Sequence, residues 1–258
     1  MYDNNYVRPK KALGQHFLTD ENIAQSIANS LNDISNCVLE IGPGTGVLTK
    51  HLLNIYDNYF VIEIDEESIR YLSEHYPALN NKIISGDFLK LDLNTFNSFP
   101  LAIIGNFPYN ISSQILFKVF ENIELCNQLV GMFQKEVAVR ICSKEGNKNY
   151  GILSVLIQAF YDVEYLFAVP PTVFNPPPKV ESAVIRLTRN SFFMDAEQRK
   201  LLKILVKTAF NQRRKMLSNA LKPLPKGDIS NIDKDILKLR AEQLTVQQFI
   251  EMSKNIFV

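Results

Sequence analysis

The chain has 258 residues, of which 46% are hydrophobic and 21% charged, and its formal net charge is +1. This length allows one substantial core and a smaller second domain. No stretch is long and apolar enough to span a membrane, and the polar segment Met1–Lys11 lacks the apolar core of a secretion signal. Three cysteines and three histidines show no metal-ligand spacing. We therefore expect a cytoplasmic, monomeric protein without a metal site.

The first informative element is a strand that leads into a glycine-rich turn and a helix. The apolar strand Cys37–Ile41 is followed by the turn Gly42–Gly46, and apolar residues then recur at helical spacing. Glycines let a ligand approach the backbone closely, and a helix N-terminus favours negative groups. A dinucleotide fingerprint needs its third glycine at position 47, which is Val47. The turn therefore predicts a nucleoside without pyrophosphate, bound at Gly42 and Gly44.

Carboxylates follow the next two predicted strands. Glu63, followed by Ile64, stands where a carboxylate can accept hydrogen bonds from both hydroxyls of a ribose. Asp87 can accept from an adenine amine, and Phe88 places a ring beside it. Because the carboxyl ends of parallel strands meet at one edge of a sheet, these residues predict one nucleoside site.

The fourth strand ends in the most specific pattern, Asn106-Phe107-Pro108-Tyr109. The amide oxygen of Asn106 and the carbonyl of Phe107 can each accept one hydrogen from an adenine N6, while Pro108 fixes the backbone. Tyr109 would stack on the base, a contact worth roughly 1 to 3 kcal/mol. A proline turn that merely closes a strand is the alternative, which the ordered set of glycine turn, two acids and this tetrapeptide makes less favourable.

The pattern of apolar residues predicts an α/β fold with a doubly wound sheet. Strands are expected at 37–41, 59–64, 83–85, 101–105, 129–134, 163–169 and 183–188. Helices are expected between them, for example at 23–31, 115–120 and 153–160. After Asn190 only helices follow, at 196–210, near 216–221 and at 246–254, the last behind a capping box of Thr245 and Gln248. The prediction is two domains, residues 1–190 and a small all-helical domain of residues 191–258.

The basic charge is concentrated in the second of these domains. Residues 191–258 hold 13 basic and 7 acidic side chains, a net charge of +6, whereas residues 1–190 carry −5. Three adjacent cations, Arg213, Arg214 and Lys215, predict contacts with RNA phosphates, although a solvated helix end would give the same pattern. A second basic segment holds Arg8, Lys10 and Lys11. It is either an arm that becomes ordered on RNA or a solvated tail.

The glycine turn, the two strand-end carboxylates, the tetrapeptide Asn106–Tyr109 and the basic cluster follow one another along the chain as they do in a known family. The chain resembles the small-subunit ribosomal RNA adenine N6-dimethyltransferases, the kasugamycin-sensitivity methylase family. The resemblance runs from Arg8 to about Phe249. It implies S-adenosylmethionine as cofactor and a Rossmann-like methyltransferase sheet of seven strands with the last antiparallel. It also implies dimethylation of two adjacent adenosines in the terminal hairpin loop of small-subunit rRNA, within an immature small ribosomal subunit.

The resemblance assigns further residues. In the family, the block Gly14–Leu18 closes over the methionine end of the cofactor, and it supplies Gln15, His16 and Leu18 here. His16 stands where Asn is usual. Asn106 contacts both cofactor and target, and Phe107 replaces the usual Leu or Ile. Phe174 would lie over the target base opposite Tyr109, although on local grounds its proline-rich loop is only a rigid connector.

Three other functions compete with this prediction. A large-subunit rRNA methylase of the macrolide-resistance type is disfavoured by the Asn211–Lys215 block and its continuation through Leu221, which resemble the small-subunit enzymes. A non-catalytic ribosome assembly factor with the same fold is disfavoured by the intact Glu63, Asp87 and Asn106. A dehydrogenase is disfavoured by Val47.

Overall fold

The computed structural model describes residues 7–32, 35, 37–96, 99–225 and 227–257. The first six residues of the predicted polar segment Met1–Lys11 lie outside this range. The chain forms two compact units. One comprises the residues up to Ala138 together with Glu164–Arg189, and the other comprises Val139–Val163 and the chain from Asn190 onward. Residues 139–163, which were predicted to lie in the first domain, join the second unit because their helix packs against two helices of that unit.

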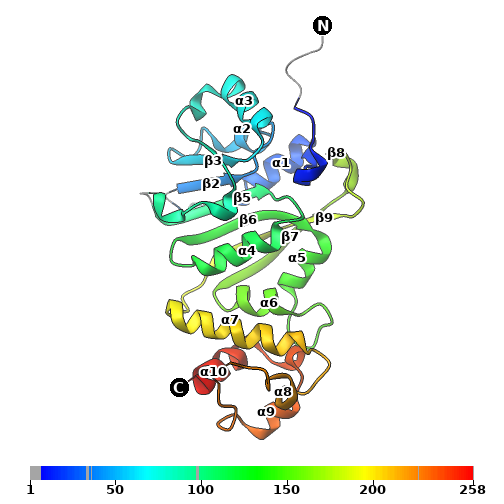
Figure 1. The fold of residues 1–258 in the computed structure, drawn as a ribbon. Coiled ribbons are helices and arrows are strands. Elements are labelled where there is room, and N and C mark those ends of the chain that lie inside the picture. Colours follow the sequence, from blue (N-terminus) through cyan, green and yellow to red (C-terminus); the bar gives the residue numbers. More distant parts are fainter. Residues whose placement is uncertain (1–6, 33–34, 36, 97–98, 226, 258) are drawn as a thin grey trace. The chain divides into compact units, whose positions relative to one another are not determined.

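A seven-stranded sheet dominates the fold, in the order β4-β3-β2-β5-β6-β9-β7 (Figure 1). Its strands are β2 (Cys37–Ile41), β3 (Tyr59–Glu63), β4 (Ile83–Ser85), β5 (Leu101–Asn106), β6 (Cys126–Gln134), β7 (Tyr161–Val169) and β9 (Ser182–Arg189). The pairs among β2 to β6 are parallel, and β9 runs antiparallel to β6. The predicted seven-stranded Rossmann-like α/β fold is confirmed, with each strand within three residues of its predicted bounds.

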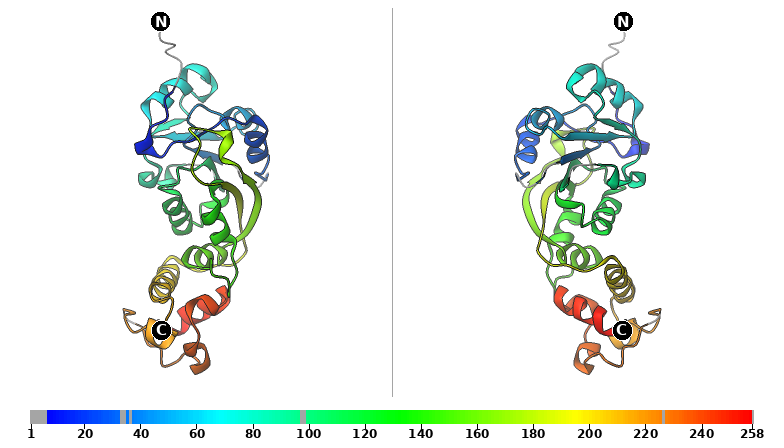
Figure 2. Two further views of the ribbon diagram at one scale, coloured as in Figure 1. Left: turned by 90° about the vertical axis from the view of Figure 1, so that its right-hand side faces the viewer. Right: turned by 90° about the vertical axis from the view of Figure 1, so that its left-hand side faces the viewer.

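Helices cover both sides of this sheet. The first unit contains α1 (Glu21–Ala28), α2 (Thr49–Leu52), α3 (Glu66–His75) and α4 (Ser112–Glu121), and α5 (Lys135–Cys142) runs across its boundary with the second. Figure 2 shows α1 and α4 on opposite sides of the sheet. Short 3-10 helices are η1 (Lys11–Leu13), η2 (Pro77–Leu79), η3 (Phe88–Lys90), η4 (Leu93–Thr95) and η5 (Pro171–Val173). The helix that the sequence predicted directly after the glycine turn is α2. The sequence patterns had not predicted α3 or the 3-10 helices, which are short or only weakly apolar.

A second, two-stranded sheet was also not predicted. In it, β1 (Phe17–Leu18) pairs antiparallel with β8 (Phe174–Asn175). Two strands of two residues are too short to show the alternation of apolar and polar residues that identifies a strand in a sequence. Only their pairing in the folded chain makes them strands. This pairing fixes the N-terminal segment against the loop that precedes β9.

The strand order creates a crevice at the carboxyl edge of the main sheet. From β2 the chain continues to β3 and β4 on one side, and β5 and β6 then lie on the other side of β2. Loops that follow β2 and β5 therefore leave the sheet in opposite directions, which opens a binding site at this point. All five residues of β2 are buried, so the sheet that carries these loops is anchored from both faces.

The second unit is mainly helical. It contains α6 (Ile152–Gln158), α7 (Ala196–Asn211), α8 (Leu217–Ala220), α9 (Lys234–Lys238), η6 (Ala241–Gln243) and α10 (Val246–Ile256), and α6 and α10 pack on α7. The predicted capping box of α10 is confirmed: Thr245 Oγ1 accepts from the Gln248 N–H at 3.1 Å, and Gln248 Oε1 accepts from the Thr245 N–H at 2.9 Å. Within the described ranges, no helix combines the length and the apolar character that crossing a bilayer requires.

Candidate active site

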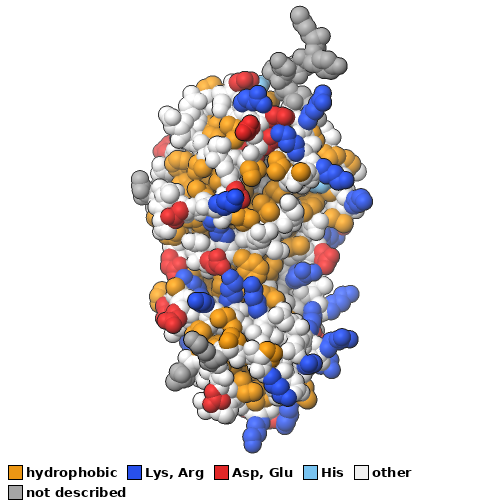
Figure 3. Space-filling view, in the orientation of Figure 1, with side chains coloured by type: hydrophobic (Ala, Val, Ile, Leu, Met, Phe, Trp, Pro, Cys, Tyr) orange, Lys and Arg blue, Asp and Glu red, His pale blue; other side chains and the backbone are white. Residues whose placement is uncertain are grey.

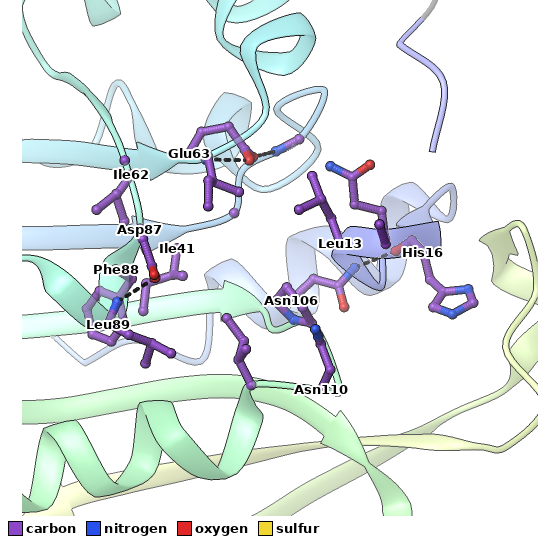
Figure 4. Close-up of a pocket in the computed structure, with 18 of the residues that line it drawn as sticks. Leu13, His16, Ile41, Ile62, Glu63, Asp87, Phe88, Leu89, Asn106 and Asn110 are labelled. Atoms are coloured by element: carbon purple, nitrogen blue, oxygen red, sulfur yellow. Dashed lines mark hydrogen bonds between the residues drawn. The ribbon is translucent and has the colours of Figure 1, made fainter. Parts of the chain in front are cut away.

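A pocket lies at the carboxyl ends of β2, β3, β4 and β5, where the predicted crevice opens (Figure 4). Its lining includes ten residues that the sequence had assigned to the site: Gln15, His16, Gly42, Gly44, Glu63, Ile64, Asp87, Phe88, Asn106 and Pro108. It also includes residues that the sequence had not assigned: Ala12, Leu13, Phe17, Ile41, Ile62, Gly86, Leu89, Asn110 and Ile111. Most of these unassigned residues are next in sequence to an assigned residue. Their position in the sequence could therefore have indicated that they line the pocket.

The glycine turn has a conformation that excludes most other residues. Gly42 and Gly44 have φ angles of +65° and +56°, in the left-handed region. A Cβ atom on Gly44 would lie 2.8 Å from the ring of Phe17, which packs directly on this glycine. The turn therefore brings bare backbone to the pocket wall, as the sequence predicted.

Glu63 is fixed at the tip of β3 by backbone donors. One carboxylate oxygen accepts from the N–H groups of Ile64 and Asp65 at 2.8 and 2.9 Å, and the other accepts from the Gly44 N–H at 3.1 Å. The residue is 4% exposed, and this burial raises the pKa of its carboxyl although the three N–H groups act to lower it. Glu63 thus presents a preoriented acceptor to the pocket.

Apolar surface and a second carboxylate complete this part of the pocket. Ile64 is 52% exposed although its side chain is aliphatic, and it lines the pocket. Asp87 begins η3, where its Oδ1 accepts from the Leu89 N–H at 2.9 Å. Phe88 is buried beside it. Figure 4 shows Glu63 and Asp87 beside the ends of two neighbouring strands, and both line this pocket.

The orientation of the Asn106 amide is set by a neighbouring carbonyl. Asn106 Nδ2 donates to the backbone oxygen of His16 at 2.9 Å (Figure 4). Because a carbonyl oxygen only accepts hydrogen bonds, the amide nitrogen must face it. The amide oxygen of Asn106 is therefore held on the opposite side as an acceptor.

Phe107 has a structural role that the sequence did not suggest. Its ring is 1% exposed and packs over Gly105 and Gly131, which are directly paired in β5 and β6. It also meets Phe133 edge to face, with ring centroids 5.2 Å apart. The side chain lies in the core and is not available to a ligand, and the use of the Phe107 carbonyl as an acceptor stays a prediction.

Tyr109 does not line the pocket but adjoins it through His16. The two rings stack with centroids 5.6 Å apart and planes inclined by 26°. The Tyr109 hydroxyl lies 2.6 Å from Ser182 Oγ, and burial raises the pKa of this phenol. His16 Nδ1 lies 2.7 Å from the Pro176 carbonyl oxygen, which ties His16 to the loop before β9.

Two residues assigned through the family resemblance lie elsewhere. Phe174 is 4% exposed and packs in the core together with Leu18, and neither residue lines the pocket. The reason is the pairing of β1 with β8, which places Leu18 directly against Phe174. In this structure His16 covers a face of Tyr109.

The N-terminal segment is attached to the pocket by Asp65. Lys10 Nζ forms an ion pair with Asp65 and lies 3.3 Å from Glu67, and Gln15 Nε2 donates to Asp65 at 3.2 Å. These contacts lower the pKa of Asp65 against the opposing effect of its burial. Lys10 is thus paired with two carboxylates, whereas the neighbouring Arg8 and Lys11 are exposed, and contact of these three residues with RNA stays a prediction.

The C-terminal cation cluster is also divided. Arg213 forms an ion pair with Glu242 and donates to the Asn147 carbonyl at 3.4 Å, so it links three segments of the second unit. Arg214 and Lys215 are exposed. A hollow beside the end of α7 is lined by residues 210–215. In the described part of the chain, no group of three or more His, Cys, Asp or Glu side chains is arranged to hold a metal ion.

The doubly wound sheet, with its glycine turn, two strand-end carboxylates and the Asn-Phe-Pro-Tyr turn around one pocket, defines a Rossmann-like methyltransferase. Comparison with known proteins shows which family of methyltransferases this is. A family model described as ribosomal RNA adenine dimethylase matches residues 7–257. The chain belongs to this ribosomal RNA adenine dimethylase family.

Individual relatives agree over nearly the whole length. Ribosomal RNA small subunit methyltransferase A of Flavobacterium johnsoniae is 54% identical over 253 residues, which cover 97% of this chain and 96% of the relative. The protein of the same name from Parabacteroides distasonis is 52% identical over 248 residues, covering 96% and 93%. The crystal structure of a dimethyladenosine transferase from Plasmodium falciparum superposes with a TM-score of 0.76 at 27% identity, covering 94% of this chain and 100% of that one.

Proposed function

We propose that this protein transfers methyl groups from S-adenosylmethionine to N6 of two adjacent adenosines in the terminal hairpin loop of small-subunit rRNA, during assembly of the small ribosomal subunit in the cytoplasm. The observation that carries the proposal is the fixed Asn106 amide in the lining of a pocket that also contains the carboxylates of Glu63 and Asp87. Support for the choice of substrate comes from the names of the relatives.

The pocket fits S-adenosylmethionine. Glu63 offers a preoriented carboxylate to the ribose hydroxyls, and Asp87 offers one to the adenine amine, while Ile64 and Phe88 supply apolar surface for the adenine ring. Gln15 and His16 line the end of the pocket next to Asn106, where the methionine part would lie. When bound, S-adenosylmethionine supplies an already activated methyl group.

The chain has to align the target amine and exclude water. The Asn106 amide oxygen and the Phe107 carbonyl accept the two N6 hydrogens, which directs the nitrogen lone pair at the methyl group. Positive charge develops on N6 during transfer, and these two oxygens stabilise it, as an oxyanion hole stabilises the opposite charge. The proton is lost to solvent afterwards, so no strong base is needed.

RNA phosphates are contacted by the exposed cations, Arg214 and Lys215 in the second unit and Arg8 and Lys11 near the N-terminus. The face shown in Figure 3 supports this proposal, because Lys and Arg side chains predominate over Asp and Glu on the lower part, which the second unit forms. Tyr109 stacks on the flipped-out base.

Deletion of the gene tests the proposal. Mass spectrometry of rRNA from the deletion strain should reveal two unmodified adenosines in the terminal loop of the small-subunit rRNA, and the intact gene should restore dimethylation. Complementation with Asn106→Ala should fail, because the N6 acceptor is lost. Loss of a methylated adenosine from large-subunit rRNA instead would favour the macrolide-resistance type, and unchanged rRNA would favour a non-catalytic assembly factor.

A further inference from the structure

We propose that Ser182 is a positioning residue for base stacking: through the phenolic hydroxyl it holds the Tyr109 ring at the orientation in which Tyr109 meets the target adenine. The inference rests on the proposed function, since it assumes that Tyr109 acts on a base. Neither the sequence pattern nor the family resemblance gave Ser182 a role, and 73 residues separate it from Tyr109.

The contact joins the Tyr109 side chain to a buried residue of the central sheet, Ser182. Ser182 is the first residue of β9, is fully buried, and lies opposite Gln134 of β6 in the sheet register. Its Oγ lies 2.6 Å from the Tyr109 hydroxyl oxygen, a short but ordinary O–H···O distance. The tip of Tyr109, which stands in the turn after β5, is thus attached to the central sheet.

Other contacts fix the backbone and the ring plane of Tyr109 but not the direction in which its side chain points. Ser112 Oγ donates to the Tyr109 carbonyl at 3.1 Å, which holds the backbone, and His16 stacks on one face of the ring, which limits the tilt of the ring plane. The phenolic oxygen lies on the axis about which the ring turns, so the bond to Ser182 does not restrict that rotation. It restricts the χ1 torsion and therefore the place of the ring tip.

A restricted ring matters because methyl transfer depends on alignment. A base stacked on Tyr109 takes its position from the ring, and N6 must face both the Asn106 oxygen and the methyl group. Loss of the Ser182 bond should lower the rate of transfer. It should leave the affinity for S-adenosylmethionine unchanged, because Ser182 and Tyr109 do not line the cofactor pocket.

A double-mutant cycle tests this inference. Ser182→Ala, Tyr109→Phe and the double variant are compared with wild type in single-turnover methylation of unmethylated small ribosomal subunits, with radiolabelled S-adenosylmethionine. Each single change should lower the rate about three- to tenfold, the effect of one neutral hydrogen bond. The double variant should be no slower than either single variant, and the KM for S-adenosylmethionine should not change.

The control is Ser253→Ala, which removes a buried serine that donates to the Ile250 carbonyl in α10. It should affect thermal stability at most. If the losses of the single variants multiply in the double variant, or if Ser182→Ala keeps the wild-type rate, the inference is overturned. Should Ser182→Ala not fold, Tyr109→Phe removes the same bond without altering β9, and a wild-type rate then overturns it. A wild-type enzyme that does not methylate the particle refutes the proposed function instead.

Discussion

Glu63 and Glu40 are both buried carboxylates near the glycine turn, but they have different surroundings. Glu63 accepts only from backbone N–H groups and lines the pocket. Glu40, one residue before the end of β2, accepts from Thr49 Oγ1 at 2.7 Å and from the Tyr59 hydroxyl, and is 1% exposed. We therefore expect Glu63 to affect ligand binding and Glu40 to affect stability.

Replacing Glu63 with alanine should weaken the binding of S-adenosylmethionine by roughly 1 to 3 kcal/mol, because two ribose hydroxyls lose their acceptor. Isothermal titration calorimetry measures the change. Glu66→Ala, which removes an exposed carboxylate in the first turn of α3, is the matched control and should keep wild-type affinity. Unchanged affinity in Glu63→Ala would remove this residue from the site.

Glu40 should make stability depend on pH near neutrality. Burial raises the pKa of Glu40 from 4.5 to about 7. Between these values the folded state binds more protons than the unfolded state, so the free energy of unfolding should fall as pH rises from about 4.5 to about 7 and then level off. The contribution of Glu40 is at most about 3 kcal/mol.

Urea denaturation at intervals between pH 5 and 8 measures this contribution. Glu40→Gln, which keeps an acceptor for Thr49 and Tyr59, should lose the part of the pH dependence that comes from Glu40. Glu74→Gln, at an exposed position on α3, should behave as wild type. Identical slopes for wild type and Glu40→Gln would contradict the assignment.

At the scale of elements, the paired glycines of β5 and β6 position the turn formed by Asn106–Tyr109. Gly105 and Gly131 lie opposite each other, and the Phe107 ring occupies the space that their missing side chains leave. Phe107, the first residue after β5, consequently packs this turn against the sheet. The two glycines explain how a phenylalanine ring is accommodated at this position.

Gly131→Ala should destabilise the protein by about 1 to 3 kcal/mol, the usual cost of overpacking. Its Cβ atom would lie 2.2 Å from the Phe107 ring, which is 1% exposed and meets Phe133 edge to face. Combination with Phe107→Leu should recover part of the loss, because the smaller side chain makes room. Chemical denaturation tests both variants. Gly151→Ala, with one atom within 4 Å of its added Cβ, at 3.9 Å, gives the cost of replacing a glycine without overpacking, here at the N-cap of α6. Additive losses would show that the ring and the glycine are not coupled.

At the scale of the whole molecule, charge and chemistry are divided along the chain. The net charge of residues 191–258 is +6 and that of residues 1–190 is −5, while the pocket belongs entirely to the first unit. Such a division allows RNA affinity to be changed without changing cofactor affinity. The structure adds that the three cations at 213–215 are not equivalent.

Replacing Arg214 and Lys215 with glutamine should weaken binding to small ribosomal subunits and flatten the dependence of log affinity on log salt by a little under one unit per lost phosphate contact. Filter binding at several salt concentrations measures the slope. Arg213→Gln should leave the slope unchanged and cost at most about 1 kcal/mol of stability, because its ion pair with Glu242 is partly exposed. Equal slopes for the double variant and wild type would move RNA recognition to the segment of Arg8 and Lys11.

The sequence by itself determined the sheet, the glycine turn and the residues at the strand ends. Each is encoded locally, by a run of apolar residues, by a turn that only glycine can form, or by a polar residue directly after a strand. Tertiary structure alone decided the pairing of β1 with β8, the burial of Phe174, the neutralisation of Lys10 by Asp65 and the bond between Tyr109 and Ser182. These contacts join residues far apart in the chain, and no local pattern of polarity or spacing specifies which distant partner a side chain meets.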